Sequence, residues 1–360
     1  MVWFVAALLL CVIAITLFYL RGENLRTFDT PRPSPRGLRG QPSEQHAAVV
    51  ASLSGLTEMT KGVSRRDQLS LMRDYLDSMG QDVSFDGEIT PVDTDGLKGE
   101  WVVAAGGDPQ RRMLYIHGGA WLMGSPLSHR AITTHYANLI GGAVFSLDYR
   151  LMPENSRQDG IDDCRSAWRW ILDNGPAGPA SPSALFVSGD SAGGNLTLSL
   201  IAWIRDQGLR APNAVVVLSP ATDGTFTSPS MRDNVATDHM LGPQFGKLNR
   251  IPRWVLQWGA WWASRIRPSH ASVSPVFDDL SGLPPTLIHA SAAEMLLDDA
   301  VRYANKARAD GSPVDLQTWE DMVHVWHIFV AELPEAQQAF TEIDAFLKTH
   351  GGAAEGEQAA

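Results

Sequence analysis

The stretch VSGDSAGGNLTLSLIAWI, residues 187–204, decides the fold because a glycine-rich turn that holds a serine joins two apolar runs. Gly189, Ser191 and Gly193 match the G-x-S-x-G pattern, in which a strand turns sharply into a helix. Glycine avoids the collisions that a side chain would make in such a turn. The pattern predicts a Ser191 hydroxyl exposed at the carboxyl edge of a sheet, with Asp190 supporting the motif. Ser191 is therefore a candidate nucleophile, and a chance Gly/Ser turn is the alternative.

A serine hydroxyl is a weak nucleophile at neutral pH, so it needs a base, an acid that orients this base, and donors for an oxyanion. Upstream, HGGA at residues 117–120 follows an apolar run, and its backbone N–H groups can point at a carbonyl oxygen. His117 supports this motif. The predicted oxyanion-hole donors are the N–H groups of Gly118, Gly119, Ala120 and Ala192. Taken alone, the two glycines also fit a simple turn.

Candidate bases lie downstream in EDMVHVWHIF, residues 320–329. His324 follows the last strand-like run, whereas His327 falls where the next helix is expected, so His324 is the predicted base. The two histidines could instead bind a metal with Glu320 or Asp321, but no third ligand has a recognisable spacing. We expect neither a metal nor an organic cofactor.

Apolar runs alternate with helical stretches along most of the chain. The runs lie at residues 101–105, 112–116, 143–149, 184–188, 214–219, 286–291 and 314–320. Continuous apolar strands between helices predict an α/β fold with a mostly parallel sheet covered on both faces. Residues 41–80 have helical spacing and are typical of two helices that form a lid or cap.

Composition excludes several classes of protein. The chain is 44% hydrophobic and 19% charged, so it can build a large core. Its formal charge of -11 argues against nucleic-acid binding. The two cysteines, Cys11 and Cys164, imply no disulfide framework.

Residues 2–20 contain no charged side chain and are long enough to cross a bilayer, with Trp3 and Tyr19 near the two ends. A cleaved signal peptide is the rival, but a basic start, a shorter apolar run and a small-residue cleavage site are missing. Residues 21–40 carry five arginines. Because no lysine or arginine precedes the apolar segment, the positive-inside rule predicts a cytoplasmic catalytic body.

These patterns divide the chain into four parts. We expect a transmembrane anchor at residues 1–20, an extended Arg/Pro-rich linker at 21–40, the folded domain at 41–349 and a disordered tail at 350–360.

A Trp-rich insertion interrupts the strand pattern. Trp254, Trp258, Trp261 and Trp262 recur at helical spacing and predict one aromatic helix face. The face could pack onto the main domain as core, form a wall of the acyl pocket, or enter a membrane interface.

Five blocks in order carry a resemblance to a known family. They are HGGAW (117–121), DYRLMPE (148–154), GDSAGGNL (189–196), EMLLDD (294–299) and MVHVW (322–326). With them the chain resembles the hormone-sensitive-lipase-like (family IV) α/β-hydrolase esterases, which include arylacetamide deacetylases and bacterial acetyl ester hydrolases. The resemblance implies an α/β-hydrolase core with a helical cap, here assigned to about residues 41–85 and 225–272. It also implies that the DYRLMPE block braces the oxyanion loop and that Asp148, Arg150 and Glu154 have structural roles.

The resemblance places the acid of a Ser-His-acid triad at Glu294, where the family usually has aspartate. Glu294 directly follows the apolar run at 286–291, so it can meet His324 at the same sheet edge. Asp298 is the alternative acid. Asp298 and Asp299 begin the next helix, where the helix dipole alone would account for them.

The predicted function is a serine carboxylic ester hydrolase that acts through an acyl-enzyme on short to medium acyl esters, with lactones or acetylated small molecules as further substrates. The alternatives are a non-catalytic receptor on the same fold and an acyltransferase or amidase with the same triad. The partners expected are a small-molecule ester and a membrane, without nucleic acid. Arylacetamide deacetylases face the lumen, in contrast to the cytoplasmic orientation that the arginines predict.

Overall fold

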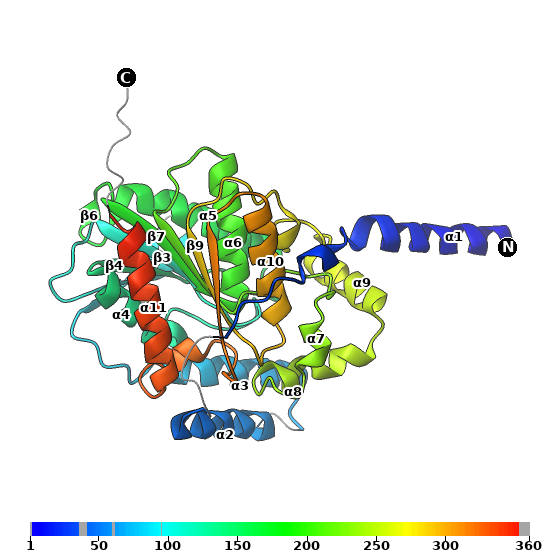
Figure 1. The fold of residues 1–360 in the computed structure, drawn as a ribbon, viewed down its shortest axis with the longest axis horizontal. Coiled ribbons are helices and arrows are strands. Elements are labelled where there is room, and N and C mark those ends of the chain that lie inside the picture. The colour runs from blue at the N-terminus through cyan, green and yellow to red at the C-terminus, as the bar shows by residue number, and fades with distance from the viewer. Residues whose placement is uncertain (1, 36–41, 60–61, 95, 353–360) are drawn as a thin grey trace.

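The computed structural model describes residues 2–35, 42–59, 62–94 and 96–352 (Figure 1). Its centre is an eight-stranded sheet in the order β1-β2-β4-β3-β7-β8-β9-β10. The strands are β1 (Glu88–Thr94), β2 (Leu97–Val103), β3 (Arg111–Ile116), β4 (Ala143–Leu147), β7 (Ala184–Asp190), β8 (Ala214–Leu218), β9 (Thr286–Ser291) and β10 (Val314–Trp319). β2 pairs antiparallel with β1 and β4, and the other neighbours pair parallel. This confirms the expected α/β fold with a mostly parallel sheet.

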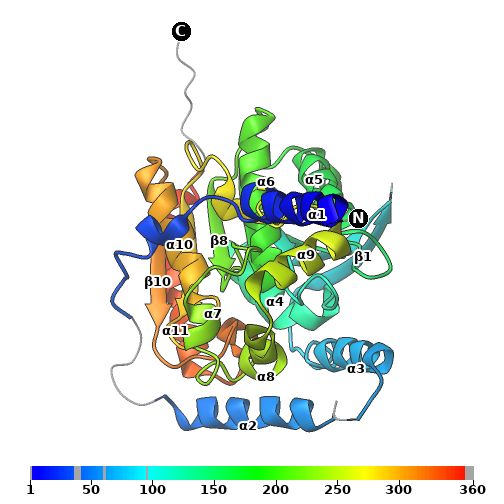
Figure 2. The ribbon, with the colours of Figure 1, turned by 90° about the vertical axis from the view of Figure 1, so that its right-hand side faces the viewer.

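Helices cover both faces of the sheet (Figure 1 and Figure 2). α4 (Arg130–Ile140) and α11 (Pro334–His350) pack on one face. α5 (Arg157–Asp173), α6 (Ser191–Asp206) and α10 (Leu297–Ala309) pack on the other. The sheet is therefore the middle layer of three, as the continuous apolar strands predict.

Two hydrophobic cores result from the alternation of side chains along each strand. In β3, Leu114 and Ile116 belong to the core beneath α5, α6 and α10, whereas Met113 and Tyr115 belong to the core beneath α4 and α11. All four side chains are fully buried. Burial on both faces explains why the strand has no alternation of polar and apolar residues.

β1 is not among the strands expected from the sequence. It is a largely exposed strand at one edge of the sheet. Polar residues and Pro91 interrupt its pattern, and proline is tolerated at such an edge. A short two-stranded sheet, β5 (Asn174–Gly175) with β6 (Gly178–Pro179), lies apart from the main sheet.

Five α-helices come from the two segments expected to form the cap. The segment before the sheet forms α2 (Glu44–Met59) and α3 (Arg65–Ser78), and the insertion between β8 and β9 forms α7 (Ser230–Asp233), α8 (Leu241–Phe245) and α9 (Arg253–Ser264). Figure 1 shows α2, α3 and α8 below the sheet. The remaining short helices are η1 (Ile15–Leu20), η2 (Leu25–Phe28), η3 (Leu127–His129), η4 (Gly246–Arg250), η5 (Pro275–Phe277) and η6 (Trp326–Phe329).

The N-terminal helix α1 (Val2–Ala14) continues into η1 and extends away from the body beside α9 (Figure 1). Within the described residues, Ala6–Phe28 is the one helical stretch long and apolar enough to cross a membrane. Trp3 is 88% exposed and Phe18 is 86% exposed. These apolar side chains have no protein core around them.

The linker after this helix is docked on the body, which corrects the expectation of an extended spacer. Leu25 is buried, Asp29 Oδ1 lies 2.6 Å from Arg302 Nε, and Arg32 Nη2 lies 2.5 Å from Asp298 Oδ1. The segment from Glu23 to Arg32 thus lies against α10, whereas residues 36–40 of the expected linker are outside the described residues. Of the expected tail, His350 still belongs to α11, and residues 353–360 are outside the described residues.

Candidate active site

Ser191 lies at the turn between β7 and α6, in a backbone conformation that residues other than glycine rarely adopt. Its φ is 51°, in the left-handed region. A Cβ on Gly193 would lie 2.0 Å from the carbonyl oxygen of Ile116, and a Cβ on Gly189 would lie 2.5 Å from Thr197 Oγ1. The two glycines are therefore required by close packing, and the turn between them presents the Ser191 hydroxyl at the carboxyl edge of the sheet.

The structure brings Ser191, His324 and Glu294 together from the ends of three different strands. The Ser191 hydroxyl donates a hydrogen bond to Nε2 of His324 at 2.9 Å. On the other side of the ring, Nδ1 of His324 donates to Oε2 of Glu294 at 2.6 Å. The carboxylate thus favours the tautomer with its proton on Nδ1, which leaves Nε2 free to accept the serine proton.

Glu294 itself is fixed by its second oxygen, because Oε1 accepts the N–H of Ser291 at 2.8 Å. Both Glu294 and His324 are buried. Burial lowers the pKa of His324, but the hydrogen bond and the negative charge of Glu294 raise it more, and the net pKa lies above the ordinary value for histidine. The pair therefore strengthens the imidazole as a proton acceptor.

The predicted oxyanion donors are not equivalent. The N–H of Gly118 donates to Oδ1 of Asp190 at 2.9 Å, so it is already engaged. In the described part of the chain, no acceptor is found for the N–H groups of Gly119, Ala120 or Ala192. Gly119, Ala120 and Ser191 line one cavity. This leaves three of the four predicted donors available to a substrate oxygen.

Asp190 holds the oxyanion loop against the strand that carries the serine. Besides Gly118, its Oδ1 accepts the Tyr115 hydroxyl at 2.6 Å and lies 3.4 Å from Nε2 of His129. Burial raises the pKa of Asp190, but His129 and the hydrogen bond of Tyr115 lower it more, so the carboxyl stays ionised. Tyr115 and His129 were not singled out in the sequence, because neither lies in a recognisable motif.

His117 has a structural position. Its ring stacks on Tyr149 with centroids 4.3 Å apart, and the Tyr149 hydroxyl donates to the His117 carbonyl oxygen at 3.0 Å. Burial lowers the pKa of His117 to about 3, so the ring is neutral. The side chain therefore supports the loop from behind.

The DYRLMPE block braces this loop through Tyr149 and Met152, whose N–H donates to the carbonyl oxygen of Trp121 at 2.9 Å. Two of its charged residues form ion pairs, a structural role that agrees with the resemblance. Arg150 Nη2 lies 2.7 Å from Asp163 Oδ1, and Glu154 Oε2 lies 2.9 Å from Nη2 of Arg73 on α3. Arg73 also donates to the carbonyl oxygens of Leu122 and Met152, so α3 is tied to both loops.

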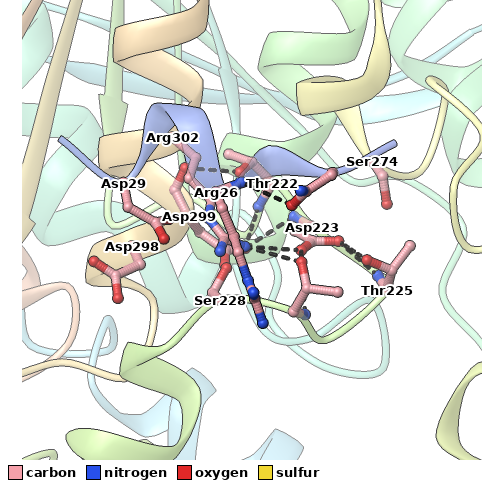
Figure 3. Close-up of polar contacts among 12 residues, drawn as sticks. Arg26, Asp29, Thr222, Asp223, Thr225, Ser228, Ser274, Asp298, Asp299 and Arg302 are labelled. Carbon is pink, nitrogen blue, oxygen red and sulfur yellow. Dashed lines mark hydrogen bonds and ion pairs between the residues drawn. The ribbon is translucent and has the colours of Figure 1, made fainter. Parts of the chain in front are cut away.

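The alternative acid, Asp298, has other partners. Arg32 pairs with its Oδ1, and the N–H of Ser230 donates to its Oδ2 at 2.8 Å. Its neighbour Asp299 accepts the N–H groups of Thr222 and Asp223 at 2.6 and 2.9 Å (Figure 3). Both carboxylates are buried and join the segment after β8 to α10. This corrects the expectation that interaction with the helix dipole is their only role.

His327 contacts a different partner from His324. Its Nε2 lies 3.1 Å from Nδ1 of His289, and burial lowers its pKa well below the ordinary value. The two histidines of the 320–329 stretch are therefore not directed at one common site.

Two cavities meet at Ser191. The smaller, of about 150 Å³, extends under α2 and α3 and is lined by Leu53, Met72, Tyr75 and Met79 among others. The larger, of about 310 Å³, extends toward α9 and is lined by Phe226, Met231, Ala260 and Pro268 among others. Most of the lining is apolar. The arrangement can hold the two sides of an ester on either side of the hydroxyl.

The aromatic face of α9 is not core. Trp254 and Trp262 are 54% and 71% exposed, and Gln257 is the buried residue of the helix. Trp258 Nε1 donates to Thr16 Oγ1 at 2.9 Å, and Trp261 packs edge-on against Tyr19 with centroids 5.7 Å apart. The helix thus lies between the larger cavity and the N-terminal apolar helix.

Comparisons with known proteins identify the family of the chain. The family model for the alpha/beta hydrolase fold matches residues 113–328. An acetyl-hydrolase of Streptomyces hygroscopicus is 35% identical over 253 residues, which cover 70% of this chain and 80% of the relative.

Solved structures extend the agreement over more of the chain. An esterase from the bacterial hormone-sensitive lipase family superimposes with a TM-score of 0.72 at 32% identity, covering 86% of this chain and 99% of that chain. A structure of EstE5 that was soaked with p-nitrophenyl butyrate has a TM-score of 0.71 at 34% identity, with the same coverage. The chain therefore belongs to the alpha/beta hydrolase fold family, in its hormone-sensitive-lipase-like (family IV) branch, and is a serine carboxylic ester hydrolase.

Proposed function

We propose that Ser191 is the nucleophile, His324 the general base and Glu294 the acid that orients it. The observation that carries this proposal is the continuous chain of hydrogen bonds from Ser191 through His324 to Glu294 at the junction of two apolar cavities. His324 Nε2 takes the serine proton while Oγ attacks the ester carbonyl carbon. The carbonyl oxygen becomes an oxyanion and accepts hydrogen bonds from the N–H groups of Gly119, Ala120 and Ala192.

Collapse of this intermediate breaks the bond to the alcohol, which leaves with the proton from His324. The acyl group stays on Ser191 Oγ. Water then attacks the acyl-enzyme with His324 again as the base, and the carboxylic acid is released.

The substrate class that we assign is an ester with a short to medium acyl chain. The larger cavity, toward α9, suits the apolar acyl chain, and the smaller suits the alcohol. The soaking of EstE5 with p-nitrophenyl butyrate and the acetyl-hydrolase relative support this range. The test is kcat/KM for p-nitrophenyl esters from acetyl to palmitoyl, with an aryl acetamide and a lactone alongside. A maximum between acetyl and octanoyl is expected, and a maximum at palmitoyl contradicts the assignment.

The N-terminal helix serves as a retained membrane anchor in this proposal. Its end contacts the body, since Ser269 Oγ donates to the Tyr19 carbonyl oxygen at 3.2 Å and Leu20 is fully buried. Cleavage would remove these contacts, which favours an anchor over a signal peptide. The exposed indoles of α9 beside this helix suit the membrane interface. The intact mass of the membrane-extracted protein is expected to be that of a chain that retains residues 2–20.

The orientation that we propose is a cytoplasmic body, because the arginines follow the apolar segment. Protease added outside sealed right-side-out vesicles is expected to leave the body intact. Digestion there would reverse the orientation without affecting the esterase assignment.

A further inference from the structure

A third cavity of about 280 Å³ lies beside the end of the N-terminal helix, away from Ser191. It is bounded by residues 21–29 after the N-terminal helix, by residues 227–229 and the end of α7, by the start of α9 and by one residue of α10. Five arginines line it: Arg21, Arg26, Arg232, Arg253 and Arg302. Residues far apart in the sequence thus bring guanidinium groups together at one place.

The acids in the lining do not balance these arginines. Asp29 pairs with Arg302 at 2.6 Å, and Glu23 pairs with Lys306 at 2.8 Å. Asp233 is the remaining carboxylate of the lining. In the described part of the chain, Arg21, Arg26 and Arg232 have no ion-pair partner. The cavity therefore carries an excess of positive charge.

The excess of positive charge acts on Arg253. Its Nε atom is buried and has no hydrogen-bond partner among the described residues. Burial lowers the pKa of Arg253, and repulsion by Arg232, Arg21 and Arg302 lowers it further. A buried donor without an acceptor is costly, so the site favours a ligand that supplies an acceptor and negative charge.

The cavity is separate from the substrate site. Asp223 and Asp299 line the larger substrate cavity, whereas Arg302 lines the arginine cavity. Figure 3 shows Arg26 and Asp29 of the N-terminal segment beside Arg302 of α10, with Asp223 and Asp299 behind them. Arg302 Nη1 lies 3.6 Å from Asp223 Oδ2, so this cluster forms the wall between the two cavities.

We propose that the arginine cavity binds a phosphate group. Guanidinium groups match phosphate oxygens as paired donors, and several arginines can share one phosphate. Two sources can supply a phosphate group at the end of an apolar helix: the headgroup of an anionic phospholipid, and free phosphate from solution. The site adds ligand binding to the esterase activity and does not depend on it.

The test uses the full chain in dodecyl maltoside, an uncharged detergent. Dihexanoyl phosphatidic acid and inorganic phosphate are titrated separately, and Kd is measured by calorimetry. The variant is Arg232→Gln/Arg253→Gln. The matched control is Arg165→Gln/Arg169→Gln, which removes the same charge from α5, where both side chains lie over Trp203. Circular dichroism checks that each variant is folded.

The unmodified chain is expected to bind at least one probe, with Kd raised about tenfold or more in the Arg232/Arg253 variant and within about twofold in the control. Binding of phosphatidic acid alone assigns the lipid headgroup, and binding of inorganic phosphate assigns the free anion as a sufficient ligand. Binding of neither probe overturns the proposal. Equal losses in both variants also overturn it, because they indicate non-specific attraction. If the Arg232/Arg253 variant is unfolded, Arg26→Gln is compared with Arg165→Gln, which removes the same single charge.

Discussion

Nδ1 of His324 lies 2.6 Å from Oε2 of Glu294, so a glutamate occupies the place where this family usually has aspartate. Glutamate is one methylene longer than aspartate. The structure accommodates that length because Oε1 of Glu294 turns back to the N–H of Ser291 and only Oε2 reaches the imidazole. The carboxylate is fully buried, and its charge is therefore weakly screened at the ring.

Replacement of Glu294 is expected to change both the rate and its pH dependence. Glu294→Gln removes the charge that raises the pKa of His324 and leaves the burial that lowers it. We expect kcat to fall by up to about 10^4-fold. The protonated imidazole cannot accept the Ser191 proton, so kcat/KM in the unmodified enzyme falls as pH drops through the raised pKa. In the variant this acid limb should move to lower pH, as measured in a pH profile of kcat/KM.

Asp298→Asn is the matched control, because Asp298 pairs with Arg32 and Ser230 instead of His324. It should leave the acid limb in place and reduce kcat far less. The opposite ranking of the two kcat values would transfer the role of the acid to Asp298.

Removal of the nucleophile is the simplest test of the triad. Ser191→Ala deletes the oxygen that lies 2.9 Å from His324 Nε2, and kcat should fall about 10^4-fold or more. The control is Ser199→Ala on the same helix, whose hydroxyl donates to the carbonyl oxygens of Ala271 and Ser272. Retention of more than a few per cent of the esterase activity by a folded Ser191→Ala protein would rule out this nucleophile.

Asp190 should act on kcat through the oxyanion loop. Asp190→Ala leaves the Gly118 N–H and the Tyr115 hydroxyl without their acceptor, which lowers the free energy of unfolding by about 3 kcal/mol. The loop that carries the oxyanion donors loses its tie, so kcat should fall by up to about 10^3-fold with little change in KM. Asp190→Asn keeps an acceptor oxygen, so its losses in the free energy of unfolding and in kcat should be smaller. An effect on stability without any loss of kcat would show that Asp190 does not position the donors.

The sequence predicted the buried strands well, because a strand covered on both faces has a continuous apolar run. The run at 286–291 coincides with β9, for example. β1 was missed because its exposed residues have no such run. The glycine pattern located the turn at Ser191 for a related reason, since only glycine fits the contacts of Gly193 with the carbonyl oxygen of Ile116.

Most individual long-range hydrogen bonds and ion pairs could not be predicted from local patterns. The tie between Gly118 and Asp190 joins residues 72 positions apart, so the sequence did not indicate that one of the four predicted donors is engaged. The docking of the linker depends likewise on Arg32 meeting Asp298. The triad roles stay predictions until the variants above are measured.

Chain-length preference should depend on Ala260, which lines the larger cavity from α9. Ala260→Phe places a ring in the space that we assign to the acyl chain, and an acetyl group is too short to reach it. Loss of burial for about three methylenes at about 0.8 kcal/mol each corresponds to about a 50-fold fall in kcat/KM for p-nitrophenyl octanoate. The value for p-nitrophenyl acetate should stay within about twofold.

Gly259→Phe is the control for this prediction, because a Cβ at Gly259 meets no heavy atom within 4 Å. It adds the same ring to the same helix but outside the cavity, so any effect of a bulky ring on the surroundings of the helix appears in both variants. Because the helix also separates the cavity from the N-terminal apolar helix, the control further distinguishes a filled pocket from a disturbed contact with Thr16 or Tyr19. A fall for acetate equal to that for octanoate would indicate general damage to the site. An unchanged octanoate value would place the acyl chain in the smaller cavity, under α2 and α3.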